Sequence, residues 1–328
     1  MNIFLTGGGG YIGSVLAREL VKSGYKVTVY DTFYFGEEVF NDVRDQLRVI
    51  RGDIRNITSD VLRGQDVVID LAAISNDPAS ELDPRLTESV NYLGRVNVAK
   101  LAKKVRVERY IAPSSAGNYG WSQKPVNEES EVNPITTYTI SNHKWEQDIL
   151  PMADNNFSVT VLRQSTVYGV SWRMRFDIIV NDFTLQVLRD GKIKIKGNGM
   201  EFRPFVHIKD DCSAIKKVLE TDVDVVNGQI FNVGASDQSL RIKDVMETVF
   251  RVLQLEPNYE FGELTDKRNY IMNCDKISKV LGFRPNYRIE DGIREVSEAL
   301  RSGFLKADDP KTITLKWYKQ LIQKGKMR

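Results

Sequence analysis

The stretch TGGGGYIGS, residues 6–14, limits the possible folds of this chain more than any other segment. It places Gly7, Gly10 and Gly13 at three-residue spacing between an apolar strand-like run, NIFLT, and a helix-like run, SVLARELVKSG. Glycines in such a turn let the backbone approach a pyrophosphate and let the helix pack tightly on the strand. The helix N-terminus adds N–H donors and a partial positive charge. The motif therefore predicts a dinucleotide-binding unit at this end of the chain.

Short runs rich in β-branched and aromatic residues alternate with helical stretches through the first half of the sequence. After NIFLT these runs are KVTVYD, LRVIRGD, DVVIDLA, ERYIAPSS and FSVTVLR, and QIFNVG follows much later. Such alternation is typical of a parallel sheet with helices on both faces. We expect an α/β fold, a doubly wound Rossmann sheet of about seven parallel strands.

The alternation fades after Arg163, where the sequence becomes irregular, aromatic-rich and basic, as in a smaller second domain. QIFNVG (229–234) still has the pattern of a buried strand, and HIKDDCSAIKKVLE before it that of a helix, so we expect the chain to return to the sheet. We predict two interleaved domains: a dinucleotide-binding domain of residues 1–168 and 205–234, and a smaller substrate-binding domain of residues 169–204 and 235–328.

The composition argues against several classes of protein. Apolar residues make up 41% of the 328 residues and charged residues 27%, as in soluble globular proteins. The balance of 46 basic and 44 acidic residues gives no support for a nucleic-acid or membrane-surface partner. Cys212 and Cys274 lie far apart without a zinc or disulfide spacing, so we expect no metal site and a reducing, cytoplasmic location. We also expect no signal peptide and no membrane span, because no apolar run approaches about 18 residues.

Asp31 ends the second predicted strand, 18 residues after Gly13. A carboxylate at this point can accept both hydrogen bonds from an adenosine ribose and would repel a 2′-phosphate. Thr32 and Phe33 after it provide no compensating arginine, so the expected cofactor is NAD rather than NADP. A solvated aspartate at a strand end is the alternative. Asp53, at the next strand end, is similarly placed for an adenine amino group, although a turn aspartate explains it nearly as well.

Further motifs extend along nearly the whole chain: GDI (52–54), DLAA (70–73), Asn91, PSSAGNYG (113–120), Tyr138 to Glu146, LRQSTVYG (162–169), GNGMEFRPFVHIKDD (197–211) and DKRNY (266–270). With the glycine loop and Asp31, they make the sequence resemble the extended short-chain dehydrogenase/reductases, and among these the NAD-dependent nucleotide-sugar epimerase/dehydratase family. The resemblance implies bound NAD, a nucleoside-diphosphate sugar as substrate, and a homodimer built on the helices near 95–105 and 138–150. It implies cofactor contacts from Gly7, Gly10, Tyr11, Ile12, Gly13, Asp31, Asp53, Ile54, Leu71, Ala72, Ala73, Asn91, Tyr138 and Asn142.

The same resemblance implies the residues that act on the sugar. Ser115 matches the family serine or threonine that hydrogen-bonds the reacting oxygen. Tyr138 matches the tyrosine that exchanges a proton with that oxygen while hydride moves between the nicotinamide and a sugar carbon, commonly carbon 4. Arg203 and Arg268 resemble the arginines that hold the diphosphate, a role suited to a planar, permanently charged group. Weaker matches suggest substrate contacts from Asn76, Thr166 and Asn181, and a helix N-terminal cap would explain Asn181 equally well.

One position departs from the family pattern. Relatives have a lysine four residues after the tyrosine, which binds the nicotinamide ribose and lowers the tyrosine pKa, whereas this chain has Asn142. An asparagine can bond ribose hydroxyls but brings no charge. Lys144 does not replace the lysine, because six residues along a helix turn it about 240° from the direction of Tyr138. We therefore expect oxidation, which needs a basic tyrosinate, to suffer more than reduction, which needs a protonated tyrosine.

The identity of two residues bears on the reaction. Nucleotide-sugar 4,6-dehydratases resemble this chain but carry an Asp-Glu pair after the catalytic threonine, and here those places hold Ala116 and Gly117. Neither residue can transfer a proton, so 4,6-dehydration is disfavoured. The segment SWRMRFDIIVNDF (171–183) resembles a subgroup of sugar-nucleotide oxidoreductases of surface-polysaccharide pathways.

The sequence thus supports one main hypothesis and one alternative. The main hypothesis is an NAD-dependent nucleotide-sugar epimerase or oxidoreductase of polysaccharide or glycoconjugate precursor synthesis. It would use Ser115 and Tyr138, with Asn142 as an altered helper. The alternative is a catalytically weakened protein that binds NAD(H) and sugar nucleotides as a sensor or partner subunit. Retention of both Arg203 and Arg268 favours an enzyme, whereas Asn142 favours the alternative.

Overall fold

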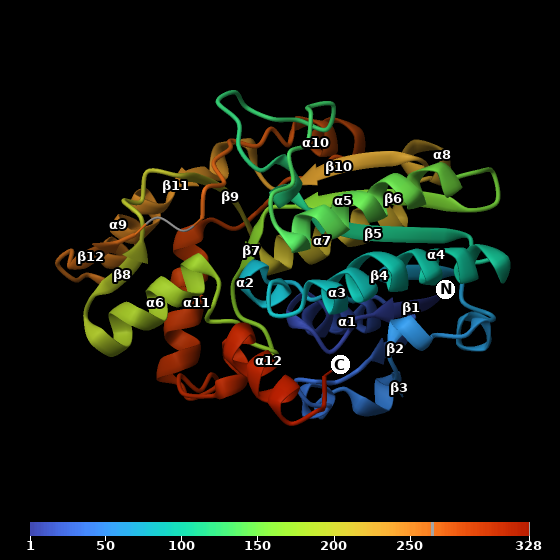
Figure 1. The fold of residues 1–328 in the computed structure, drawn as a ribbon, viewed down its shortest axis with the longest axis horizontal. Helices are drawn as coiled ribbons and strands as arrows, with labels where there is room; N and C mark the ends of the chain where they lie inside the picture. The colour runs from blue at the N-terminus through green and yellow to red at the C-terminus, as the bar shows by residue number, and fades with distance from the viewer. Residues whose placement is uncertain (264–265, 328) are drawn as a thin grey trace.

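The computed structural model describes residues 1–263 and 266–327, and its core is a seven-stranded parallel sheet. The strand order is β10-β6-β5-β4-β1-β2-β3, so the chain starts near the middle and builds outward on both sides (Figure 1). All seven strands predicted from the sequence are present, and every pairing in this sheet is parallel. Their bounds are β1 Asn2–Thr6, β2 Lys26–Asp31, β3 Leu47–Arg51, β4 Val67–Asp70, β5 Arg109–Ser115, β6 Ser158–Gln164 and β10 Gln229–Val233.

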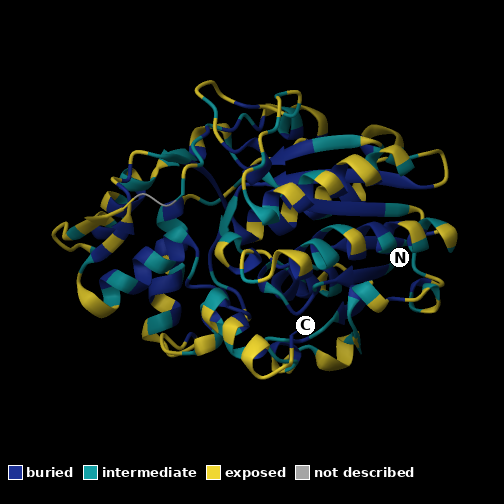
Figure 2. Cartoon of the chain, in the orientation of Figure 1, coloured by how far each residue is buried: buried dark blue, intermediate teal, exposed yellow. Residues whose placement is uncertain are grey.

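Helices cover both faces of this sheet, as the alternating pattern predicts. Because neighbouring residues of a strand point to opposite faces, Ile3 and Leu5 of β1 pack in one apolar cluster and Phe4 in another. The cluster with Ile3 includes α1 and α7, and the cluster with Phe4 includes α4 and α5. Figure 2 shows the central strands β1, β4, β5 and β6 almost wholly buried and exposed residues on the outer sides of the helices. The edge strand β3 is only half-buried or exposed. The helices of this part are α1 Tyr11–Lys22, α2 Asp77–Ser80, α3 Pro84–Glu88, α4 Arg95–Lys104, α5 Thr137–Ile149, α7 Ile208–Glu220 and α8 Val223–Val226.

A smaller, more irregular region lies beyond the carboxyl ends of the strands (Figure 1). It contains a three-stranded sheet in the order β11-β9-β7, a pair of strands β12-β8, and a group of helices in mutual contact. The two-domain boundaries drawn from the sequence stay a proposal, although β10 does return to the large sheet after this region has begun. The elements are β7 Thr166–Tyr168, β8 Ile193–Lys196, β9 Phe202–His207, β11 Ser239–Arg241, β12 Tyr259–Gly262, α6 Ile179–Asp190, α9 Ile242–Leu253, α10 Asp275–Leu281 and α11 Ile289–Arg301.

The last helix, α12 Thr314–Gln323, lies beside α2 and the loop that follows β2 (Figure 1). Trp317 donates from its ring nitrogen to the Tyr34 carbonyl at 2.7 Å. The ring of Tyr318 lies 5.4 Å from that of Phe35. The C-terminal helix therefore covers the segment that follows Asp31.

A buried ion pair fastens α5 to the sheet. The Glu146 carboxylate accepts from Arg163 of β6 at 2.8 Å, from Ser114 of β5 at 2.5 Å and from Asn118 at 2.9 Å. Glu146 is 1% exposed and Arg163 4% exposed. Because one carboxylate joins a helix to two strands, it also fixes the position of Tyr138 in the first turns of the same helix.

No helix among residues 1–263 and 266–327 is both long and apolar enough to cross a membrane.

Replacing Arg163 by Met tests this fastening. The change leaves the Glu146 carboxylate buried and without its charged partner, so we expect the free energy of unfolding to fall by about 3–5 kcal/mol. The double variant Glu146→Gln/Arg163→Met removes both charges and should lose clearly less. Urea denaturation of the two variants and the unaltered protein measures both values. Equal losses in the single and double variants would show that the unpaired charge is not the cause.

Candidate active site

A cavity of about 560 Å³ lies at the carboxyl ends of the parallel strands. This is where a doubly wound sheet forms its crevice, at the point where the strand order changes direction from β1. Residues from the glycine loop, from the ends of five strands, and from the smaller region line it together. Those expected from the sequence are Gly7, Gly10, Tyr11, Ile12, Gly13, Asp31, Asp53, Ile54, Leu71, Ala72, Ala73, Asn76, Ser115, Tyr138, Thr166, Arg203 and Arg268.

The glycine loop has no room for larger side chains. Gly7 has a φ of +64°, and a Cβ on it would lie 2.6 Å from the Ala72 nitrogen. A Cβ on Gly13 would lie 2.4 Å from the Gly7 carbonyl oxygen. The glycines thus hold α1 close against the loop after β1, and the first N–H groups of α1 face the cavity. Such a cradle fits the pyrophosphate of a dinucleotide.

Asp31 is held in place at the end of β2 by two backbone groups. Its carboxylate accepts from the Gly9 nitrogen at 3.0 Å and from the Phe33 nitrogen at 2.7 Å. Burial raises the pKa of this carboxyl, and the two backbone donors act against that rise. The carboxylate lines the same cavity as the glycine loop, so its position fits the ribose contact expected from the sequence.

An arginine outside the sequence predictions also lines this part of the cavity. Arg173 is buried with its guanidinium 3.5 Å from the centre of the Phe35 ring, and it donates to the Thr314 hydroxyl at 3.0 Å. Its Nε has no hydrogen-bond partner among the described residues. Burial, and then the neighbouring Arg175, lower the pKa of Arg173 to about 10, so it remains a cation at neutral pH. A buried cation with an unpaired donor fits a bound anion, such as a diphosphate.

Ser115 and Tyr138 lie together at the inner part of the cavity. Ser115 ends β5, and its hydroxyl oxygen accepts from the Gly117 nitrogen at 3.0 Å. Tyr138 stands in the first turn of α5, whose start is capped by Thr136. Burial, followed by the carboxylate of Asp77, raises the pKa of the Tyr138 phenol.

Lys144 lies on another side of the same helix, as its spacing predicts. Its Nζ pairs with Glu88 at 2.8 Å, and its side chain is about half exposed. It therefore brings no charge to the inner part of the cavity.

The two arginines expected to bind a diphosphate are both engaged by carboxylates. Asp266 bridges them, at 3.0 Å from Arg203 and 2.6 Å from Arg268. Asp77 pairs with Arg268 on its other side at 2.9 Å. Burial opposes ionisation of Asp266, yet its bonds to the arginines hold the pKa of its carboxyl far below the usual range. Arg268 also lies close to Ser115, because a Cβ on Gly117 would be 3.1 Å from the Ser115 hydroxyl and 3.3 Å from Arg268.

Three asparagines named from the sequence do not line the cavity. Asn91 exchanges hydrogen bonds with the backbone of Ile74, at 2.8 and 3.1 Å, and so braces the loop after β4. Asn181 accepts from the Gly169 nitrogen and donates to the Tyr11 hydroxyl and the Arg175 carbonyl. Neither has a free polar group for a ligand. Asn142, the third, is 1% exposed.

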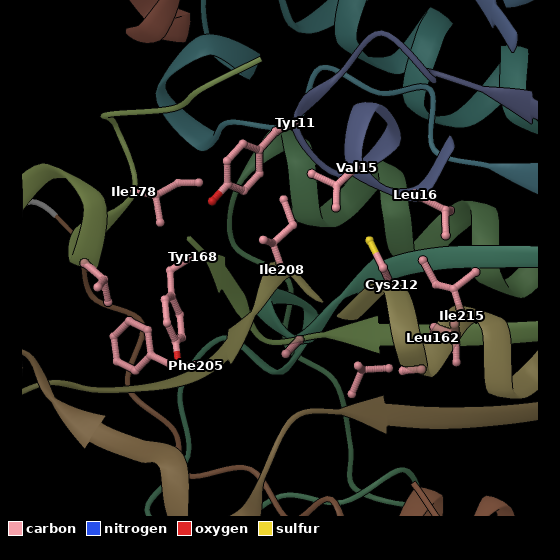
Figure 3. Close-up of a cluster of buried hydrophobic side chains, with 14 of the residues drawn as sticks. Tyr11, Val15, Leu16, Leu162, Tyr168, Ile178, Phe205, Ile208, Cys212 and Ile215 are labelled. Carbon is pink, nitrogen blue, oxygen red and sulfur yellow. The ribbon is translucent and has the colours of Figure 1, made fainter. Parts of the chain in front are cut away.

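Two expected cofactor contacts use their side chains within the protein. The Tyr11 hydroxyl donates to the Gly169 carbonyl at 2.6 Å, and Figure 3 shows the ring in an apolar cluster with Ile178 and Ile208. Only the backbone of Tyr11 is therefore placed for a cofactor. Asp53 accepts from the Arg55 nitrogen and pairs with its side chain at 2.6 Å, which is the turn role considered as an alternative.

The two remaining residues predicted to contact substrate, Asn76 and Thr166, differ in how free their side chains are to bind a ligand. Asn76 caps α2 with its oxygen and donates to Asp177 at 3.0 Å, so its amide is largely occupied. Thr166 lines the cavity at the start of β7.

Sequence reasoning missed several charged residues of the cavity: Asp77, Arg95, Arg173, Arg175, Asp177 and Asp266. For some of them the sequence contains a signal. Asp266 begins the DKRNY motif, and Arg173, Arg175 and Asp177 stand at alternate positions in SWRMRFD. Arg95 has no such signal, since it occupies an ordinary place in an amphipathic helix.

Comparison with known proteins finds relatives that are named as enzymes of nucleotide sugars. It is 27% identical over 316 residues to the UDP-glucose 4-epimerase of Lactobacillus helveticus, covering 89% of this chain and 94% of that protein. It is also 27% identical over 324 residues to the dTDP-glucose 4,6-dehydratase of Streptomyces niveus, covering 92% and 93%. The solved structure of MoeE5 in complex with UDP-glucose and NAD matches with a TM-score of 0.82 and 25% identity, covering 93% of this chain and 100% of that chain.

A family model matches residues 3–234, which include all seven strands of the large sheet, the glycine loop, Ser115 and Tyr138. The chain belongs to the NAD dependent epimerase/dehydratase family.

Proposed function

We propose that this protein is an NAD-dependent nucleotide-sugar epimerase or oxidoreductase that transfers hydride at a sugar carbon. Carbon 4 is the proposed position. The observation that carries the proposal is the single cavity shared by the glycine loop, Asp31, Ser115, Tyr138 and two arginines. It combines a place for a dinucleotide, a proton-transfer pair and cations for a diphosphate.

The residues at one end of the cavity fit NAD. The glycine cradle and the unpaired buried Nε of Arg173 suit its pyrophosphate, and the Asp31 carboxylate suits a ribose with free hydroxyls. The MoeE5 structure, similar over nearly the whole chain, contains NAD with UDP-glucose. When bound, NAD supplies the hydride acceptor and donor for conversion between a sugar hydroxyl and a ketone.

Ser115 and Tyr138 handle the proton of this conversion. In the oxidation direction, ionised Tyr138 takes the proton of the sugar hydroxyl while Ser115 hydrogen-bonds the same oxygen. In the reduction direction, neutral Tyr138 returns the proton. Because burial and Asp77 raise the pKa of Tyr138, its neutral form predominates at neutral pH, and reduction finds the residue in the required state.

Arg203 and Arg268 are the proposed ligands of the substrate diphosphate. Both already hold the Asp266 carboxylate, which occupies the place of an anion between them. A diphosphate carries more charge and more acceptor oxygens than one carboxylate, so it can replace Asp266 as the partner of the two guanidinium groups.

The proposal favours epimerisation or simple redox chemistry over 4,6-dehydration. Ala116 and Gly117 offer no acid or base, and a side chain on Gly117 would come within 3.3 Å of Thr139, Ser115 and Arg268. Asp77, a carboxylate that lines the cavity, is paired with Arg268. A relative at 27% identity is a dTDP-glucose 4,6-dehydratase, so the reaction products have to be identified to distinguish the two reactions.

Replacing Asp31 by Asn tests the cofactor assignment. An amide keeps the size of the side chain but loses one acceptor for the ribose hydroxyls, so we expect the Kd for NAD to rise about 10-fold or more. Isothermal titration calorimetry with NAD measures the change, and NADP should bind the unaltered protein more weakly than NAD. Unchanged NAD affinity in Asp31→Asn would place the ribose elsewhere.

A panel of UDP-, dTDP-, GDP- and CDP-sugars over pH values of about 6 to 10 tests the reaction. With a substrate of the enzyme, absorbance at about 340 nm should change, and oxidation should accelerate with rising pH as Tyr138 ionises. Tyr138→Phe should slow the reaction about 100-fold or more while still binding the sugar nucleotide. Binding of NAD and sugar nucleotide without redox change or product at any pH would instead support the sensor or partner-subunit hypothesis.

The homodimer expected from the family is likewise proposed, through the outer faces of α4 and α5. The neighbouring Leu93 and Ile140 expose their side chains by 57% and 41%. Sedimentation equilibrium at micromolar concentration should therefore give a dimer. The double variant Leu93→Asp/Ile140→Asp should shift it toward monomer with an unchanged circular dichroism spectrum. A monomer in the unaltered protein would remove the proposal.

A further inference from the structure

A buried arginine from a neighbouring helix reaches the position of the missing lysine. Arg95, in the first turn of α4, is 2% exposed and lines the same cavity as Tyr138. Its guanidinium lies 3.3 Å from the Trp145 ring centre. One of its terminal nitrogens, Nη1, lies 3.4 Å from the Oδ1 atom of Asn142, within hydrogen-bonding distance.

The remaining nitrogens of Arg95 hold it rigidly. Nη2 donates to the backbone carbonyls of Asp70 and Pro113 at 2.7 and 2.8 Å. Nε pairs with the Asp70 carboxylate at 3.2 Å. That carboxylate also accepts from the hydroxyls of Thr6 and Tyr110. Because every other donor group of the guanidinium is directed at β4 and β5, Nη1 is fixed toward α5.

The contact with Arg95 determines how the Asn142 amide is oriented. A guanidinium can only donate, so the amide oxygen must face Arg95 and the amide nitrogen must face away. Nδ2 of Asn142 is buried and has no hydrogen-bond partner among the described residues. Residues four apart share a helix face, so Asn142 lies beside Tyr138, and its N–H groups remain available on that side.

Other charges act on Tyr138 from the elements around it. Asp77 of α2 raises the pKa of the phenol after burial, whereas Asn142, Arg95 and Ser115 lower it. Arg175 is paired with Asp177 at 2.8 Å, and Arg268 with Asp77 and Asp266, so these cations are largely compensated. On the outer face of α5, Lys144 is paired with Glu88.

We propose that Arg95 and Asn142 together take the place of the lysine: Arg95 supplies the positive charge from α4, and the Asn142 amide passes its effect to Tyr138. Arg95 is thus a positioning residue, since it acts through Asn142. Polarisation by the guanidinium makes the Asn142 N–H a stronger donor, which stabilises the ionised phenol. The inference rests on the proposed role of Tyr138.

A purely structural role is the competing explanation, because Arg95 also neutralises Asp70 and ties two strands to α4. A structural role predicts loss of stability without a change in the ionisation of Tyr138. The two explanations are therefore separated by measuring the pKa of Tyr138 itself.

The test is an ultraviolet difference titration of tyrosine in the full-length protein, with and without NAD. Each protein is compared with its own Tyr138→Phe counterpart, so that the difference isolates one phenol from the 13 tyrosines. In Asp70→Asn/Arg95→Met, where no buried carboxylate is left unpaired, the midpoint for Tyr138 should rise by about one pH unit. Arg95→Gln, which keeps a donor but no charge, should show a similar rise. The pH profile of any sugar oxidation should shift in the same direction.

Rescue and a matched control complete the experiment. Adding Asn142→Lys to Asp70→Asn/Arg95→Met returns a cation at residue 142 and should restore the original midpoint. Arg18→Met removes a different buried arginine, in α1, from the ion pair with Asp42, and should reduce stability without moving the midpoint. If the Arg95 variants do not fold, as judged by circular dichroism, Asn142→Leu decides, because it removes the connecting amide and should raise the midpoint.

An unchanged midpoint in the charge-removing variants, or in Asn142→Leu when they do not fold, would overturn the inference. This outcome is distinct from failure of the proposed function, because the titration needs no sugar substrate. A shifted midpoint in a protein that converts no sugar nucleotide would keep the Arg95 inference and reject the enzymatic one.

Discussion

The site depends on the parallel direction of all seven strands in the large sheet. Parallel strands end at the same edge of the sheet, so residues far apart in the sequence meet there. Gly7 after β1, Asp31 at the end of β2, Ala72 after β4 and Ser115 at the end of β5 are brought to one cavity in this way. Tyr138 is added from a helix, and the ion pair between Glu146 and Arg163 holds that helix against β5 and β6.

Buried charge is the second constraint on this site. The cavity collects several arginines, and most of them are paired with a carboxylate: Arg95 with Asp70, Arg175 with Asp177, and Arg268 with Asp77 and Asp266. An unpaired charge in such a place is costly, so these pairs limit which positions can change independently. Arg173 is the exception within the cavity, with an unpaired Nε and a pKa lowered to about 10. It is therefore the cation with the most to gain from an anionic ligand.

The change from lysine to asparagine at residue 142 shows why a motif has to be assessed in three dimensions. Along the sequence, Asn142 is a loss of charge, and Lys144 is the only nearby replacement. In the structure, Lys144 points outward to Glu88, and the cation beside Asn142 comes from residue 95, on a different helix. Helix periodicity was sufficient to exclude Lys144, whereas no local pattern could indicate Arg95.

The sequence by itself determined the parts of this protein that depend on local pattern. Strand-like runs, the glycine spacing and Asp31 after β2 predicted the seven-stranded Rossmann sheet and the glycine-loop end of the cavity, because each depends on neighbours in the chain. Ser115, Tyr138, Arg203 and Arg268 were expected from the resemblance to a known family. Only the tertiary structure decided how polar side chains divide between ligand and scaffold. Asn91 and Asn181 form hydrogen bonds within the protein, mostly with backbone atoms of other segments, and Asp266 and Asp77 pair with the arginines expected to bind the diphosphate. Those partners lie 12 or more residues away in the sequence for most of these contacts, and pairing over such distances is set by packing of the whole chain.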